Sequence, residues 1–128
     1  VNDTATPTRA SGGSHWSLLV GRKAASTSAP MVFEYYDSMS TANLGAAQRL
    51  AAKIAALRGG GAAGGAKAAR REAAEVRVME TAKQANSYDC GVYVLLFAQA
   101  VVEAFLAGDA SPAVEASSPG DERSARRE

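Results

Sequence analysis

Two short runs near the start of the chain are rich in apolar, β-branched and aromatic residues. They cover residues 15–20 (H-W-S-L-L-V) and 31–37 (M-V-F-E-Y-Y-D), and a polar stretch that contains glycine and proline separates them. This pattern predicts an antiparallel hairpin. If paired positions have numbers that sum to 52, His15 lies opposite Asp37. Any register of the same parity keeps both side chains on one side of the sheet.

The next segment has the period of a helix. Residues 42–58 place Leu50, Ile54 and Leu57 at helical spacing, with basic residues elsewhere, which predicts an amphipathic surface helix whose apolar face they form. The tract that follows, residues 59–66 (G-G-G-A-A-G-G-A), offers no side chains to bury. We therefore expect a flexible loop there.

The most apolar part of the chain begins at Cys90. Before it, residues 76–80 (V-R-V-M-E) alternate in polarity and predict another strand. Residues 90–106 are apolar nearly all round, which predicts a buried central helix with Asp89 or Ser87 as its N-cap. The expected fold class is therefore α/β, with a small mixed or antiparallel sheet packed on the helix that carries the cysteine.

Length and composition fit one small domain, because the chain has 128 residues of which 47% are apolar. We place this domain at residues 1–107. Residues 108–128 turn to Ser, Pro, Ala and charged types, which predicts a disordered tail. The chain opens at Val1 without an initiating Met, so we expect further sequence upstream.

Charge and cysteine content exclude several classes of partner and site. Lys and Arg number 14 against 13 Asp and Glu, so no field favours nucleic acid or an anionic membrane. The long apolar run is interrupted by Gln99 and Glu103 and is too short to span a bilayer. A single cysteine allows no internal disulfide and no CxxC metal pair, which suits the cytoplasm or nucleus.

Three residues that are weak signals singly become a candidate site when they are taken together. A lone His or Cys is usually structural. Here, however, the His begins one strand and the Asp ends its neighbour, so Asp37 can orient the His15 imidazole. Cys90 starts the apolar helix, where unpaired N–H groups and the helix dipole favour the thiolate. These positions predict a cysteine nucleophile with a His–Asp pair.

Three further residues fit this chemistry. Gln84 lies in the loop before the helix, and its amide could join the Cys90 backbone N–H in an oxyanion hole, although a solvated loop amide is the simpler interpretation. Gly91 removes a side chain where substrate backbone would approach, or it is a loose helix start. Trp16 either covers a narrow substrate channel or fills the core.

The segments G-G-S-H-W-S-L-L-V, Y-Y-D-S-M and Q-A-N-S-Y-D-C-G-V-Y-V-L closely resemble the ubiquitin-like protease (Ulp, sentrin-specific protease) family of cysteine proteases. The resemblance covers roughly residues 1–107 and implies a papain-like fold of the Ulp type. It implies His15 as general base and acid, Asp37 as its orienting partner, Cys90 as nucleophile and Gln84 as oxyanion donor. The substrate-binding residues that it implies are Trp16, Asn86 and Gly91.

Within the family, the V-N-D start and the N-S-Y-D-C-G segment are most similar to the deneddylase branch, whereas desumoylating members tend to have N-G-S-D-C-G. The resemblance implies cleavage after the diglycine tail of the neddylation modifier, with its conjugates such as cullins as partners, a monomeric enzyme and no cofactor or metal. The family's domain also has a substantial part before the histidine that is missing here. Three alternatives remain: a desumoylating protease, a Cys-dependent acyltransferase, and a non-catalytic fragment that binds a modifier.

Overall fold

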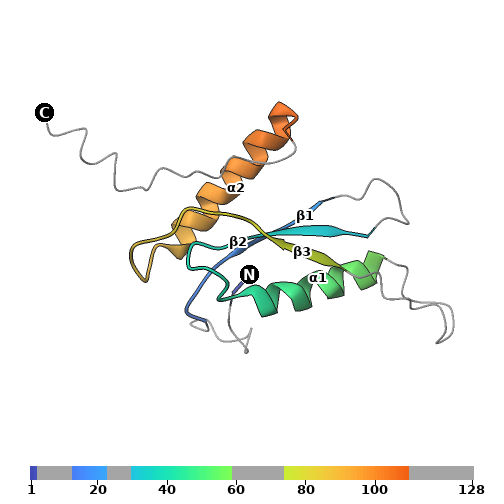
Figure 1. Ribbon diagram of the computed structural model, residues 1–128, viewed down its shortest axis with the longest axis horizontal. Helices are drawn as coiled ribbons and strands as arrows, with labels where there is room; N and C mark the ends of the chain where they lie inside the picture. The colour runs from blue at the N-terminus through green and yellow to red at the C-terminus, as the bar shows by residue number, and fades with distance from the viewer. Residues whose placement is uncertain (3–12, 23–29, 59–73, 110–128) are drawn as a thin grey trace, which may run out of the picture.

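The computed structural model describes residues 1–2, 13–22, 30–58 and 74–109. Its elements in chain order are β1 (Leu18–Arg22), β2 (Val32–Tyr36), α1 (Leu44–Arg58), β3 (Glu75–Val78) and α2 (Cys90–Ala107). Together they form one mixed sheet in the order β1-β2-β3, in which β2 runs antiparallel to β1 and parallel to β3. Figure 1 shows α1 and α2 on opposite faces of this sheet, which confirms the predicted α/β class. The predicted loop at 59–66 and the tail from residue 110 onward lie outside the described residues.

The predicted hairpin forms, but its register is shifted by two positions. Paired residues have numbers that sum to 54 rather than 52, so Gly21 lies opposite Phe33. A Cβ atom on Gly21 would lie 3.1 Å from the ring of Phe33, so the glycine gives this aromatic side chain its room. The same register lets Arg22 form a two-pronged ion pair with Glu34, at 2.9 and 3.0 Å. A shift of two keeps the parity, so each side chain stays on the predicted face.

The apolar face predicted for α1 is wrong. Leu50, Ile54 and Leu57 are 42%, 36% and 80% exposed, and the buried face of the helix consists of alanines. These are Ala47, Ala51 and Ala55, each at most 1% exposed. Small side chains let a helix approach its neighbours closely, and α1 contacts the central strand β2 and its neighbour β3. Packing therefore selected the small residues of α1 rather than the large ones.

The core on the other face of the sheet joins β2 to α2. Tyr36 packs with Tyr93, Phe97 and Val101, and its ring centroid lies 6.1 Å from that of Phe97. The three helix residues repeat every four positions, so they form a single stripe along α2. The helix ends at Gly108, whose positive φ of 80° closes the last turn.

The prediction that α2 is a buried central helix is wrong for the described residues. Outside the stripe, Val92, Leu95, Val102, Phe105 and Leu106 are between 47% and 78% exposed. An all-round apolar sequence requires cover on every side, and the described residues cover one side only. Contrary to the sequence prediction, α2 is also long and apolar enough to cross a membrane by length and composition. Core helices of soluble proteins meet the same two criteria, so these properties do not decide the setting of α2.

Candidate active site

His15 and Asp37 lie together at one end of the hairpin. His15 precedes β1 and Asp37 directly follows β2, so both are in the chain segments that flank the paired strands. The Nε2 atom of His15 lies 2.7 Å from Oδ1 of Asp37, and the residues are 4% and 2% exposed. The sequence prediction that these two side chains meet is thus confirmed, although they meet beyond the strand ends rather than as strand partners.

Two more donors hold the carboxylate of Asp37. The hydroxyl of Tyr35 donates to Oδ2, and the backbone N–H of Met39 donates to Oδ1 at 2.7 Å. Burial raises the pKa of Asp37, but the hydrogen bonds from Tyr35, Met39 and His15 outweigh it and leave this pKa below its usual value. Asp37 is therefore an ionised, immobilised acceptor for the imidazole of His15.

Asn43, directly before α1, is hydrogen-bonded to both Tyr35 and His15. Its backbone N–H donates to the Tyr35 hydroxyl at 3.0 Å, and its side-chain amide donates to the carbonyl oxygen of His15 at 3.1 Å. Asn43 is 1% exposed, so both hydrogen bonds are buried. Neither Tyr35 nor Asn43 was singled out from the sequence, because nothing in the spacing of a tyrosine or an asparagine reveals such contacts.

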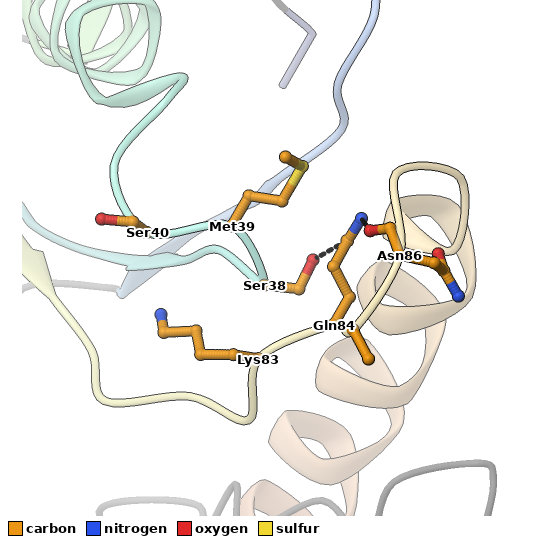
Figure 2. Close-up of a pocket in the computed structure, with 7 residues that line it drawn as sticks. Ser38, Met39, Ser40, Lys83, Gln84 and Asn86 are labelled. Atoms are coloured by element: carbon orange, nitrogen blue, oxygen red, sulfur yellow. Dashed lines mark hydrogen bonds between the residues drawn. The ribbon is translucent and has the colours of Figure 1, made fainter.

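Gln84 lies in the loop between β3 and α2, and it is bound at both ends of its side chain. Its Oε1 accepts a hydrogen bond from the hydroxyl of Ser38 at 2.5 Å, and its Nε2 donates to the carbonyl of Asn86 at 2.6 Å. An amide nitrogen carries two hydrogens, so one N–H remains for another acceptor. These residues lie at an open cleft of about 360 Å³, and Figure 2 shows the side chains that line it. The cleft is lined by Ser38, Met39, Ser40, Lys83, Gln84, Ala85 and Asn86.

Asn86 shapes the turn that leads into Cys90. Its Oδ1 accepts the backbone N–H groups of Tyr88 and Asp89, and its Nδ2 donates to the Asp89 carboxylate at 2.6 Å. Asp89 occupies the N-cap of α2, one of the two predicted positions, but its side chain makes no capping bond. Cys90 is the first helical residue and is 5% exposed. The cysteine is thus held at a helix N-terminus, as the sequence predicted.

The two remaining predicted substrate contacts face open space. Trp16 is 52% exposed, so the alternative that it fills the core is wrong. At Gly91, an added Cβ would meet no atom within 4 Å. The packing of the described residues therefore does not require a glycine at position 91. A substrate backbone that approached Cys90 closely would require one, because it would occupy this open space. Within the described residues, no group of three His, Cys, Asp or Glu side chains could hold a metal ion.

The geometry offers the parts of covalent acyl transfer: an oriented imidazole, a thiol at a helix N-terminus and an amide donor. Comparison with known proteins agrees with this chemistry. A family model described as "Ulp1 protease family, C-terminal catalytic domain" matches residues 7–111.

Among curated proteins, the chain is 33% identical over 108 residues to NEDD8-specific protease 1 of Arabidopsis thaliana. That match covers 84% of this chain and 41% of the relative. It is likewise 33% identical over 107 residues to human sentrin-specific protease 8, with 82% of this chain and 42% of the relative covered. The chain therefore spans about two fifths of the length of these relatives.

Proposed function

Because the chain belongs to the Ulp1 protease family, we propose that it is the catalytic part of a cysteine isopeptidase that cleaves after the carboxy-terminal diglycine of a ubiquitin-like modifier. The observation that carries this proposal is the buried hydrogen bond of 2.7 Å between His15 and Asp37. This bond fixes the orientation of the His15 imidazole so that it can act as a base. The single cysteine, Cys90, begins a helix of the same small domain.

In the proposed reaction, His15 takes the proton of Cys90 and the thiolate attacks the carbonyl carbon of the modifier's last glycine. Asp37 binds Nε2, so Nδ1 is the ring nitrogen that exchanges this proton. The remaining N–H of the Gln84 amide and the backbone N–H of Cys90 hold the oxyanion.

The intermediate then collapses with cleavage of the C–N bond, and His15 protonates the departing lysine amine. A thioester between the modifier and Cys90 remains. His15 next removes a proton from water, which attacks the thioester carbonyl and releases the modifier's carboxylate and the free thiol. General acid–base catalysis of this kind contributes about 10² to 10⁴ in rate.

The neddylation modifier is the proposed substrate, because one relative is named for NEDD8 and the N-S-Y-D-C-G segment is most similar to deneddylases. Two features support selection of glycine. Gly91 leaves open space beside the nucleophile, and Trp16, the exposed neighbour of His15 in the chain, would lie against a tail without side chains. Conjugates such as cullins, a monomeric state and an intracellular location, in the cytoplasm or nucleus, belong to the same proposal.

The test is to react the 128-residue chain with ubiquitin, sumo and neddylation modifiers that each carry a carboxy-terminal electrophile. We expect a covalent adduct with the neddylation modifier, and none with the Cys90→Ala variant. Because Cys90 is the only cysteine, a thiol adduct identifies its site without mapping. An adduct with sumo alone would replace deneddylation by desumoylation, and the absence of any adduct would refute the protease proposal for this chain.

The same preparation separates the protease from an acyltransferase. Incubation with acetyl-coenzyme A would leave an acetyl group on Cys90 of a Cys-dependent acyltransferase. We expect no acetylated Cys90, and its appearance would contradict the proposed reaction.

A further inference from the structure

Ser38 connects the turn that carries Asp37 with the loop that carries Gln84. It follows Asp37 in the chain, is 2% exposed, and contacts Gln84 twice. Its hydroxyl donates to Gln84 Oε1 at 2.5 Å, and its carbonyl oxygen accepts the backbone N–H of Gln84 at 3.0 Å. Figure 2 shows the Ser38 hydroxyl directed at the end of the Gln84 side chain.

These contacts fix the orientation of the Gln84 amide, with its oxygen toward Ser38 and its nitrogen toward Asn86. The carbonyl of Asn86 can only accept, so the nitrogen of the amide must lie beside it, at 2.6 Å. The amide oxygen then faces Ser38, whose hydroxyl can donate to it. A flipped amide would set its oxygen against the Asn86 carbonyl, two acceptors facing each other. Ser38 thus satisfies the oxygen in the one orientation that Asn86 permits.

The backbone around Ser38 is bound to the same loop. The carbonyl of Asp37 accepts hydrogen bonds from Thr81 Oγ1 at 2.7 Å and from Lys83 Nζ at 2.9 Å. The loop that carries Gln84 therefore rests on the turn that carries Asp37. A displacement of one would move the other, because every one of these contacts joins the two segments.

We propose that Ser38 is a positioning residue for the oxyanion donor: its hydroxyl holds the Gln84 amide so that the second N–H points to the carbonyl under attack. The inference rests on the proposed protease function. Ser38 itself does not touch the substrate. Its effect on the reaction passes through Gln84 alone, which separates this role from a general contribution to stability.

The experiment is a double-mutant cycle with Ser38→Ala and Gln84→Ala in the full 128-residue chain, measured by hydrolysis of a neddylation-modifier coumarin amide. Loss of an oxyanion donor costs about 10² to 10³ in kcat. We expect Ser38→Ala to cost less, about tenfold in kcat with little change in KM, because the donor remains but is less well held. In the Gln84→Ala background, Ser38→Ala should cause no further loss.

An unchanged kcat in Ser38→Ala, or the same tenfold loss in the Gln84→Ala background, would overturn the proposal. The control is Ser87→Ala, which removes an exposed hydroxyl from the loop before α2 and should leave kcat unchanged. A failure of the protease function itself has a different signature, since wild-type chain would then release no coumarin.

A second readout judges the positioning role without any turnover. In wild-type chain the side-chain NH₂ of Gln84 should show the restricted motion of an amide that is hydrogen-bonded at both its oxygen and its nitrogen in ¹⁵N relaxation. Ser38→Ala should raise its mobility while Ser87→Ala does not. Equal mobility of the Gln84 amide in Ser38→Ala and wild type would overturn the inference whatever the activity.

Discussion

Replacement of Tyr35 by phenylalanine removes the hydroxyl that binds Asp37 and keeps the packing of the ring. Tyr35 is fully buried, and its hydroxyl donates to Asp37 and accepts the N–H of Asn43 at 3.0 Å. A hydrogen bond to a charged group contributes about 1.5–3 kcal/mol, and a buried N–H without an acceptor costs about 1–3 kcal/mol. The two losses share one atom and do not add in full, so we expect the free energy of unfolding to fall by about 2–4 kcal/mol.

The loss should depend on pH in a defined direction. Folding lowers the pKa of Asp37: burial opposes this shift, and the hydrogen bonds from Tyr35, Met39 and His15 produce it. A carboxyl whose pKa is lowered on folding stabilises the protein above its unfolded pKa of about 3.9 and loses that contribution as the pH falls through the folded value. Without Tyr35 the folded pKa of Asp37 rises, so the difference in stability between wild type and variant should be largest near neutrality and should shrink in acid, where the loss from the unpaired N–H of Asn43 remains.

At neutral pH the hydroxyl is present as a donor, because burial and the adjacent Asp37 raise the pKa of Tyr35 to about 12. The assay is urea unfolding at about pH 7 and about pH 3, followed by the fluorescence of the single tryptophan. The matched control is Tyr36→Phe, which loses a buried hydroxyl bonded to Glu34 at 2.8 Å. It should also destabilise the fold but leave the acid dependence of Asp37 unchanged. If Tyr35→Phe unfolds like wild type at about pH 7, or if its deficit is as large at about pH 3 as at about pH 7, the explanation is refuted.

Three further substitutions test the helix that carries the cysteine. Gly91→Ala places a methyl group in open space and favours the helix, so stability should be unchanged or raised by up to about 1 kcal/mol. The methyl group would, however, obstruct the diglycine backbone, so kcat/KM should fall about tenfold or more, and an undiminished kcat/KM would remove Gly91 from the substrate contacts. Phe97 lies on the buried face of α2 at 1% exposure, so Phe97→Ala should lower the free energy of unfolding by about 3–5 kcal/mol. Leu95 is 71% exposed, so Leu95→Ala should change the free energy of unfolding by no more than about 0.5 kcal/mol. Similar losses from both in urea unfolding would contradict the assigned faces.

The hairpin illustrates how far the sequence determines the site. Side chains alternate along a strand, so the parity that places His15 and Asp37 on one side follows from position alone. The register does not follow from alternation. It depends on fits such as Gly21 against Phe33 and on the ion pair of Arg22, which become visible only when both strands are in place.

The helices illustrate where periodicity misleads. In α1 the large residues attract attention, yet the alanines face the sheet, because what matters is how closely the helix backbone approaches the strands. In α2 an apolar composition on all sides predicted full burial, but the described sheet covers only the stripe of Tyr93, Phe97 and Val101. The composition of a helix indicates which faces could be buried, whereas the packing of the sheet determines which face is buried.

The site residues found only in the structure are those that support others. Tyr35, Ser38 and Asn43 act through a hydroxyl or an amide whose partner lies on another segment. Tyr35 and Ser38 stand in the Y-Y-D-S-M segment of the family resemblance, but these residue types are common in strands and turns, so the sequence does not reveal what they contact. The residues expected to touch the substrate carry a stronger signal, because a lone Cys at a helix start and a His–Asp pair have few structural reasons to occur together.

The proposed reaction passes through a thioester between Cys90 and the carboxy terminus of a ubiquitin-like modifier. To detect this thioester, the chain is mixed with a neddylation-modifier coumarin amide, the reaction is quenched in acid within the first turnover, and the intact mass is measured. We expect a species that is heavier than the chain by one modifier minus one water, that hydroxylamine cleaves, and that is absent from Cys90→Ala. Coumarin release that persists in Cys90→Ala would contradict the thioester. Coumarin release by wild type and His15→Ala in which neither protein forms this species would contradict it as well.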